Sequence, residues 1–158
     1  ENFGGHTYAA GLSLKEENLD AFTQRFLKLA ADEIIPEQMT PQIDIDAVLD
    51  LQDINAKFMS ELKKMNPFGN QKPVFCSLGV KDYGTSKLVG KDLEHIKLEL
   101  IDDKSNTPIH GIAFGMHQHN THIKNMKPFN ICYTIEENTY NGNTSLQLMV
   151  KDIKENDI

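Results

Sequence analysis

The stretch "LVGKDLEHIKLELIDDKSNTPIHGIAFG", from Leu88 to Gly115, decides the fold class of this chain. Two apolar, strand-like runs, Leu88–Ile101 and Ile109–Phe114, lie on either side of the turn sequence "DDKSNTP". Alternating apolar and β-branched residues favour strands, whereas clusters of Asp, Asn, Ser, Thr and Pro favour turns. The stretch therefore predicts two strands of a β-rich domain.

Three more strand candidates continue this pattern on both sides. They are Val74–Asp82, Phe129–Glu136 and Ser145–Ile153, the last two separated by the turn-rich "NTYNGNT". Between the third and fourth strands, "GMHQHNTHIKNMK" is not strand-like and can hold a short helix. This order is typical of an OB-fold barrel. We therefore predict an α+β chain, in which a helical segment precedes a five-stranded OB-fold β-barrel.

A long helix is predicted before the barrel. "SLKE", Ser13–Glu16, has the pattern of a capping box, with a Ser N-cap and a Glu three residues later. Apolar residues then recur at helical spacing, at Leu19, Phe22, Phe26, Leu29 and Ala30. We predict a helix over residues 14–34 that ends before Pro36.

The segment that leads into the barrel alternates in "QIDIDAVLDLQD", Gln42–Asp53. It predicts a strand with its aspartates on a solvated face, because same-face neighbours lie about 6.5–7 Å apart, too far to share one metal ion without other ligands. Asp53 is the expected N-cap of a helix that runs to Met65 and packs on the barrel. The connector "NPFGNQKPVF" follows, and we expect the barrel to begin near Pro73.

The composition is that of an ordinary globular protein. With 158 residues, 39% of them hydrophobic, the chain can form one domain, or a domain with an appendage, around a real core. No apolar run approaches the roughly 18 residues of a membrane span, so we expect no membrane association and a cytoplasmic location. Cys76 and Cys132 lie in strand-like runs, and buried free thiols are favoured over a disulfide. The net charge of −7 argues against tight, non-specific binding to polyanions, so a nucleic-acid site has to be a local patch.

The start of the chain, "NFGGHTYAAGLSL", has the residues of an anion site. Adjacent Gly4 and Gly5 let backbone N–H groups approach an anion, and left-handed glycine conformations form an anion-binding concavity. His6 adds a donor for a phosphate oxygen. The alternative is a tight turn before the helix.

Three stretches in this order resemble the RecJ single-strand-specific exonucleases, a branch of the DHH phosphoesterases. "FGGHTYAAGLSL" resembles the GGHxxAAG motif of the DHH-associated domain. "PQIDIDAVLDLQDINAKFMSELKKMNPFGNQKPVF" resembles the segment ending in LxPFGxGNPxPxF, although "PFGNQKP" lacks the second glycine and the Asn-Pro. Gly90, His95–Ile96–Lys97 and Ile112–Ala113–Phe114 are similar to residues that recur in the family's OB domain.

This resemblance implies a division into three parts. Residues 1–41 would be the end of the DHH-associated domain, residues 42–153 the OB domain with its lead-in strand and helix 53–65, and residues 154–158 a tail. The parent would be a 5′–3′ single-strand-specific DNA exonuclease, a phosphodiester hydrolase of repair and recombination that uses manganese or magnesium. The chain starts at Glu1 rather than Met and has no adjacent His pair, so we expect the Asp-His-His metal domain upstream. The fragment alone would have no catalytic residue or cofactor of its own and be inactive.

The partners implied are single-stranded DNA and other repair proteins, with no membrane. The residues predicted to contact the phosphates are Gly4, Gly5, His6, Lys87, Lys91, His95 and Lys97. Tyr83 and Tyr133 are predicted to stack on bases, whereas Phe114, although a stacking candidate, fits the core better.

Two alternatives remain open. His117, His119 and His122 could chelate zinc or nickel, but surface histidines without a bound metal are favoured because no Cys or carboxylate lies within the run. The barrel could instead be a protein-interaction module with an acidic surface. A positive groove across the barrel would favour nucleic acid, and a uniformly acidic barrel would favour the interaction module.

Overall fold

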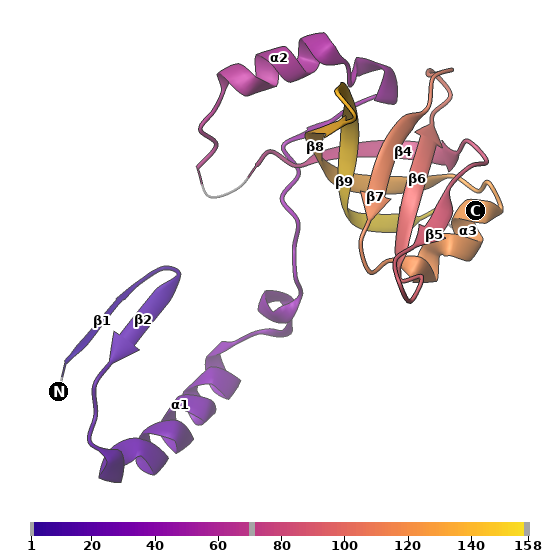
Figure 1. The fold of residues 1–158 in the computed structure, drawn as a ribbon. Helices are drawn as coiled ribbons and strands as arrows, with labels where there is room; N and C mark the ends of the chain where they lie inside the picture. The colour runs from indigo at the N-terminus through magenta and orange to yellow at the C-terminus, as the bar shows by residue number, and fades with distance from the viewer. Residues whose placement is uncertain (1, 70–71, 157–158) are drawn as a thin grey trace. The chain divides into compact units, whose positions relative to one another are not determined.

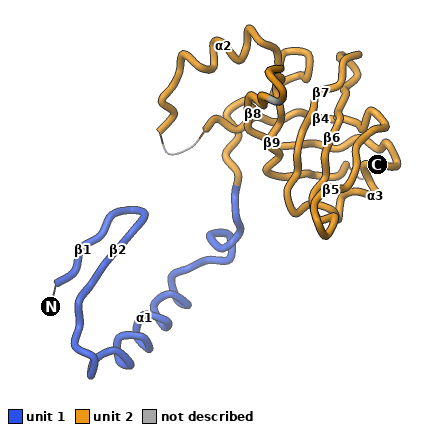
Figure 2. Tube along the Cα trace, viewed as in Figure 1, with its two compact units in different colours: residues 1–42 blue, residues 43–158 orange. Residues whose placement is uncertain are grey.

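The computed structural model describes residues 2–69 and 72–156. The chain divides between Gln42 and Ile43 into two compact units, coloured blue and orange in Figure 2. The predicted boundary lies one residue earlier, between residues 41 and 42. The division falls in an irregular stretch that follows the short 3-10 helix Pro36–Met39.

Unit 1 consists of a β-hairpin and a helix. Strands β1 (Phe3–His6) and β2 (Ala9–Leu12) are antiparallel, with Phe3 opposite Leu12 and His6 opposite Ala9. The helix α1 (Leu19–Glu33) follows a 3-10 turn, Glu16–Asn18. The stacked rings of Phe22 and Phe26 have centroids 5.8 Å apart, and no residue of α1 is buried in the part of the chain that the structure describes.

The predicted helix over residues 14–34 begins too early, and its capping box is absent. Among the described residues, no side chain caps the 3-10 turn Glu16–Asn18 or α1. The N-cap of the first turn is Lys15, two residues after Ser13, which still belongs to the hairpin, where its N–H donates to the carbonyl of Asn2 at 2.9 Å. The C-terminal end agrees with the prediction, since Ile34 is already extended before Pro36.

Unit 2 is a β-barrel. Its strands are β3 (Ala47–Val48), β4 (Phe75–Asp82), β5 (Lys87–Val89), β6 (His95–Ile101), β7 (Ile109–Ala113), β8 (Phe129–Tyr140) and β9 (Asn143–Glu155). The sheet order is β3-β4-β8-β9-β7-β6-β5, and β4 also pairs with β6 through Lys81 and Asp82. This extra pairing closes the barrel, as predicted, through β4, β8, β9, β7 and β6 (Figure 1).

One predicted strand and one predicted turn differ from the structure. The predicted strand Leu88–Ile101 is a hairpin of β5 and β6, whose turn holds Gly90 and Leu93 at positive φ, 96° and 56°. The segment "NTYNGNT" is mostly strand, because Asn141 and Gly142 alone make the turn, with φ of 49° and 78°. Asn-Gly is favoured in two-residue hairpin turns that need two positive φ angles. The tail predicted from residue 154 is still β9 as far as Glu155, and residues 157 and 158 lie outside the described part.

The lead-in segment forms much less strand than its alternation predicts. Only Ala47 and Val48 pair with β4, in parallel register. Asp46 is not simply solvated, because its Oδ2 accepts a hydrogen bond from the N–H of Val74 at 2.8 Å. Residues 51–53 then form a 3-10 turn, which ends the strand.

The helix after this turn is α2 (Ala56–Lys64). Its N-cap is Asn55 rather than the predicted Asp53, and Asn55 Oδ1 accepts from the N–H of Phe58 at 3.1 Å. Asp53 belongs instead to the preceding 3-10 turn. In the connector that follows, residues 70 and 71 lie outside the described part of the chain.

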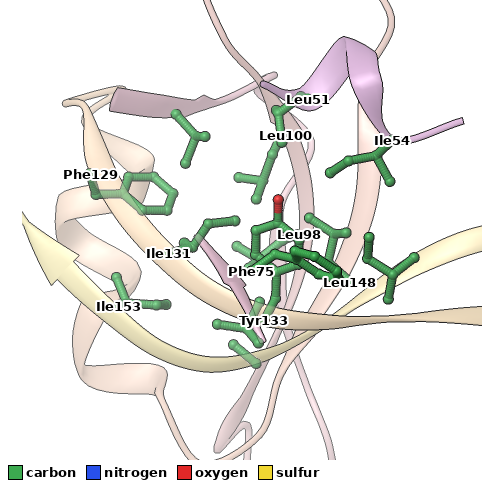
Figure 3. Close-up of a cluster of buried hydrophobic side chains, with 14 of the residues drawn as sticks. Leu51, Ile54, Phe75, Leu98, Leu100, Phe129, Ile131, Tyr133, Leu148 and Ile153 are labelled. Carbon is green, nitrogen blue, oxygen red and sulfur yellow. The ribbon is translucent and has the colours of Figure 1, made fainter. Parts of the chain in front are cut away.

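The core fills the barrel and extends to α2. Alternate residues of the strands point inward, and those with at most 1% exposure include Leu98, Leu100, Phe129, Ile131, Tyr133 and Leu148 (Figure 3). Ile96 is also completely buried. As predicted, α2 packs on the barrel, where the rings of Phe58 and Phe75 meet edge to face at 5.6 Å. The predicted short helix is α3 (Asn120–Lys124), which buries Ile123 completely.

Among residues 2–69 and 72–156, no helix has both the length and the hydrophobicity that a membrane crossing requires.

Candidate nucleic-acid interface

The outer face of β5, β6 and β7, with the turn between β5 and β6, carries four of the predicted site residues, which are Lys87, Lys91, His95 and Lys97. On β6, Ile96, Leu98 and Leu100 point into the core, so the residues between them point outward. Lys97 is one of these, and it lies directly opposite Lys87 on β5 and Ile112 on β7. The strand period therefore places Lys87 and Lys97 on one surface.

Lys87 and Lys97 are exposed and lack a carboxylate partner. Neither they nor Lys91, in the turn between β5 and β6, form an ion pair among the described residues. Several lysines elsewhere on the unit are paired: Lys63 with Glu137, Lys72 with Glu136 and Lys104 with Asp50, each at 2.7 Å, and Lys81 with Asp103 at 3.1 Å. Like charges directly opposite each other destabilise a sheet. An anion placed between Lys87 and Lys97 would remove this repulsion.

His95 and Phe114 form an aromatic pair next to the lysines. Their rings meet edge to face with centroids 4.9 Å apart. His95 Nδ1 accepts a hydrogen bond from the N–H of Gly115 at 3.0 Å, which leaves Nε2 as the donor, 3.3 Å from Glu94 Oε1. The ring of His95 is therefore fixed by contacts on two sides.

Phe114 is 54% exposed, so the expectation that it belongs to the core is wrong. Ala113, the last residue of β7, is completely buried, and the alternation of the strand turns the next side chain outward. Gly115 then leaves the strand direction with a φ of 68°. This alternation was the signal in the sequence that could have identified Phe114 as an exposed aromatic residue.

The two predicted tyrosines differ. Tyr83 is 50% exposed at the end of β4, where its N–H donates to the carbonyl of Glu99 at 2.8 Å. Tyr133 is completely buried among apolar side chains (Figure 3), and its hydroxyl hydrogen-bonds Ser77 Oγ at 2.7 Å. Burial raises the pKa of the Tyr133 phenol well above its ordinary value of 10.0. Tyr133 cannot stack on a base, and its prediction as a binding residue is wrong.

Acidic side chains also lie on this face. Glu94 is beside His95, and Glu99 Oε1 is 3.6 Å from His110 Nδ1, its neighbour on β7. His110 is exposed there and was not among the predicted residues. The face therefore carries both signs of charge, with the unpaired lysines concentrated near the β5–β6 hairpin.

Gly4, Gly5 and His6 form a strand rather than a loop. Gly4 lies opposite Gly11 and Gly5 opposite Ala10, so both glycines have strand conformation instead of the left-handed concavity expected for an anion. A Cβ at Gly5 would make a tight contact with Ala10 Cβ, at 3.0 Å, so packing favours glycine there. All three residues are exposed.

The histidine cluster makes internal contacts. His119 Nδ1 lies 2.8 Å from Glu155 Oε1, and His122 Nδ1 lies 3.2 Å from Glu155 Oε2. His122 Nε2 donates to the carbonyl of Pro128 at 3.1 Å, and only 8% of its side chain is exposed. His119 and His122 are thus not surface histidines, but link the α3 region to the end of β9.

The closed barrel, with α3 between β7 and β8, places unit 2 among OB domains. Residues 45–152 match the family model of the RecJ OB domain, and the chain belongs to this family. It is 29% identical to the single-stranded-DNA-specific exonuclease RecJ of Haemophilus influenzae and 28% identical to that of Bacillus subtilis. These matches cover 96% of the chain, but only 26% and 19% of the two relatives.

A solved structure supports the same fold. RecJ of Thermus thermophilus in complex with Mn2+ matches 99% of this chain and 22% of that one, with a TM-score of 0.72 and 19% sequence identity. The RecJ resemblance and the α+β fold with an OB domain are thereby confirmed. The chain spans about a fifth to a quarter of the length of these relatives.

Proposed function

We propose that this chain is the DNA-guiding part of a 5′–3′ single-stranded-DNA-specific exonuclease of repair and recombination, and that single-stranded DNA lies across β5, β6 and β7. The observation that carries the proposal is that Lys87 and Lys97, which form no ion pair with a carboxylate among the described residues, lie opposite each other on a barrel of the RecJ OB family. The same barrel exposes the aromatic rings of Phe114 and Tyr83. Proteins that bind single strands combine cations along the backbone with rings on which bases stack.

The phosphates would lie at the β5–β6 hairpin. Lys87, Lys91 and Lys97 supply three ammonium groups that no carboxylate neutralises among the described residues. A phosphate between Lys87 and Lys97 replaces a repulsion by two attractions, so binding gains more there than at a lysine already paired with Glu or Asp. His95, at the start of β6, would add an Nε2–H donor in exchange for its contact with Glu94 Oε1, at 3.3 Å.

The bases would lie against Phe114 and Tyr83. Both rings are about half exposed, and the ring of Phe114 is anchored by its edge-to-face contact with His95, whereas only the backbone of Tyr83 is held, by the carbonyl of Glu99. Anchored rings lose little side-chain entropy on stacking. Each stacked base would contribute about 1–3 kcal/mol.

We assign the hydrolytic chemistry to another part of the whole enzyme. The Thermus structures are RecJ in complex with Mn2+ and with Mg2+, and hard cations of this kind take several carboxylate or imidazole ligands. In the part of this chain that the structure describes, no three His, Cys, Asp or Glu side chains are grouped to hold a metal ion. The donor set does not fit the ions, so this chain would position the strand.

The test is fluorescence anisotropy of a labelled oligonucleotide at several salt concentrations. We expect a Kd in the micromolar range or weaker at physiological salt, and a log–log salt slope of about −2 for three phosphate contacts. Lys97→Ala should weaken binding and reduce this slope by about 0.7. Lys57→Ala, at an exposed lysine on α2, is the matched control and should change neither. Binding that is insensitive to salt and to Lys97→Ala would contradict the proposal and favour the protein-interaction module.

A further inference from the structure

Cys76 on β4 lies directly opposite Cys132 on β8. Both thiols are free; Cys76 is buried and Cys132 is half-buried. On β8, the neighbours of Cys132 in the sequence, Ile131 and Tyr133, point into the barrel, so Cys132 is on the outer side. Residues directly opposite each other in a sheet share a face. The two thiols therefore meet on the outer side of the β4–β8 pair.

The hydrogen bonds of β4 show which kind of pair this is. The carbonyl of Cys76 accepts from the N–H of Leu49, next to β3, at 2.8 Å. The N–H and C=O of one strand residue point to the same side, so both groups of Cys76 face β3 and not β8. Cys76 and Cys132 are thus a non-hydrogen-bonded pair, the type with the closer side chains and Cα atoms about 4.5 Å apart. Disulfides need a Cα separation of about 4.4–6.8 Å, which this pair meets without strand movement.

We propose that Cys76 and Cys132 form a reversible oxidation site that accepts two-electron oxidation from a small-molecule disulfide such as oxidised glutathione. The more accessible Cys132 thiolate attacks one sulfur of glutathione disulfide, and one glutathione thiolate leaves. The Cys76 thiolate then attacks Cys132 Sγ in the mixed disulfide, and the second glutathione thiolate leaves. Each cysteine loses one proton and one electron, and glutathione disulfide is reduced to two thiols.

The surroundings of Cys132 make this oxidation slow at neutral pH. Burial, the neighbouring Cys76 thiol and the carboxylate of Asp152 raise the pKa of Cys132 to about 11 from an ordinary 9.0. Asp152 is its register partner on β9, whereas β3 places the apolar Val48 opposite Cys76. Since the thiolate is the attacking species, the rate should rise about tenfold per pH unit below pH 11.

The experiment incubates the folded chain with oxidised glutathione at mildly alkaline pH and follows the intact mass. We expect the loss of two hydrogen atoms, a peptide joining Cys76 to Cys132, and reversal by dithiothreitol. The melting temperature should rise by roughly 10 °C, because the bond closes a long loop of the unfolded chain. Oxidation of the urea-unfolded chain serves as the positive control for the reagent.

Two single variants separate the steps. Cys76→Ala should stop at one glutathione attached to Cys132, since the resolving thiol is missing. Cys132→Ala should leave Cys76 unmodified, because Cys76 is only 6% exposed. Glutathione that stays on Cys132 in the wild-type chain, or a folded chain that does not react at a pH near 11 while the unfolded chain does, would overturn the proposal.

Discussion

Lys87 and Lys97 lie directly opposite each other on the antiparallel strands β5 and β6. Both are exposed, and among the described residues neither is paired with a carboxylate. Such a pair lowers the stability of the free domain, and an anion would restore it. The same two residues therefore connect the stability of the barrel with its proposed ligand.

The first prediction concerns the loss of stability caused by the repulsion between Lys87 and Lys97. Lys97→Gln removes the repulsion and should stabilise the barrel by a few tenths of a kcal/mol at low salt. The gain should disappear at high salt, where the repulsion is screened. Urea midpoints at two ionic strengths measure both effects. Lys63→Gln is the control, because Lys63 is paired with Glu137 at 2.7 Å. Loss of this ion pair should leave the stability unchanged or lower it, in contrast to the gain expected for Lys97→Gln.

The second prediction concerns stacking. Phe114→Ala should weaken binding of a single-stranded oligonucleotide by about 1–3 kcal/mol, because one stacked base would be lost. Leu78→Ala removes another exposed apolar side chain, on β4, and should leave the affinity unchanged. Titration by anisotropy under identical salt measures both variants. Equal losses in the two variants would argue against a stacking role for Phe114.

The third prediction is a pH dependence that comes from Tyr133. Burial raises the pKa of its phenol in the folded state, so above the ordinary value of 10.0 the unfolded chain loses this proton first. Stability from Tyr133 is thus fully present below pH 10 and decreases as the pH rises further. Tyr133→Phe should make the free energy of unfolding fall less steeply above pH 10, although it costs about 1 kcal/mol at neutral pH through the lost bond to Ser77.

The matched variant for this experiment is Tyr83→Phe. Tyr83 is half exposed, so this variant controls for the removal of a tyrosine hydroxyl outside the core. Chemical denaturation at a series of pH values from neutral to strongly alkaline gives the three curves. A Tyr133→Phe curve parallel to that of the wild type would show that the phenol does not contribute.

The fourth prediction concerns the link between α3 and β9. Glu155→Ala removes the carboxylate that lies beside both His119 and His122. The nearly buried His122 would lose its Nδ1 partner, so we expect a loss of about 1–3 kcal/mol in the free energy of unfolding. Glu17→Ala breaks the exposed pair with Lys15, at 3.8 Å, and should have almost no effect. Urea denaturation at neutral pH compares the two.

The sequence predicts the barrel well because its strands follow a period of two and its turns use residues with clear preferences. It also predicts that α2 packs on the barrel, since the apolar face of that helix includes Phe58 and Leu62. It fails where hydrogen bonds between distant residues decide the local structure. Ser13 ends the hairpin, so the first helical turn starts only at Glu16, and only two residues of the alternating lead-in segment find partners on β4.

The site residues show the same limit. Side chains alternate between the two faces of a strand, so an aromatic residue points into the core or to solvent according to its position in this alternation. Tyr133, predicted to stack on bases, is buried, whereas Phe114, predicted to lie in the core, is exposed. The opposition of Lys87 and Lys97 depends on the register of a hairpin whose turn was expected to be continuous strand. The face to which a side chain points and the register of a strand are set by the pairing of the strands, and a single sequence indicates this pairing only indirectly.

The last prediction is that this chain alone does not shorten DNA. Two-metal cleavage of a phosphodiester needs carboxylates and imidazoles that converge on ions about 3.5–4 Å apart. Within the described residues, Asp46 and Asp50 are engaged with the Val74 N–H and with Lys104, and His119 and His122 are held by Glu155. A labelled single strand incubated with the chain and manganese should therefore keep its length on a denaturing gel. A longer member of the family serves as the positive control. The contrary result would be a manganese-dependent shortening activity that copurifies with the chain and is lost when acidic residues of the chain are substituted. That result would place catalysis in this part of the enzyme.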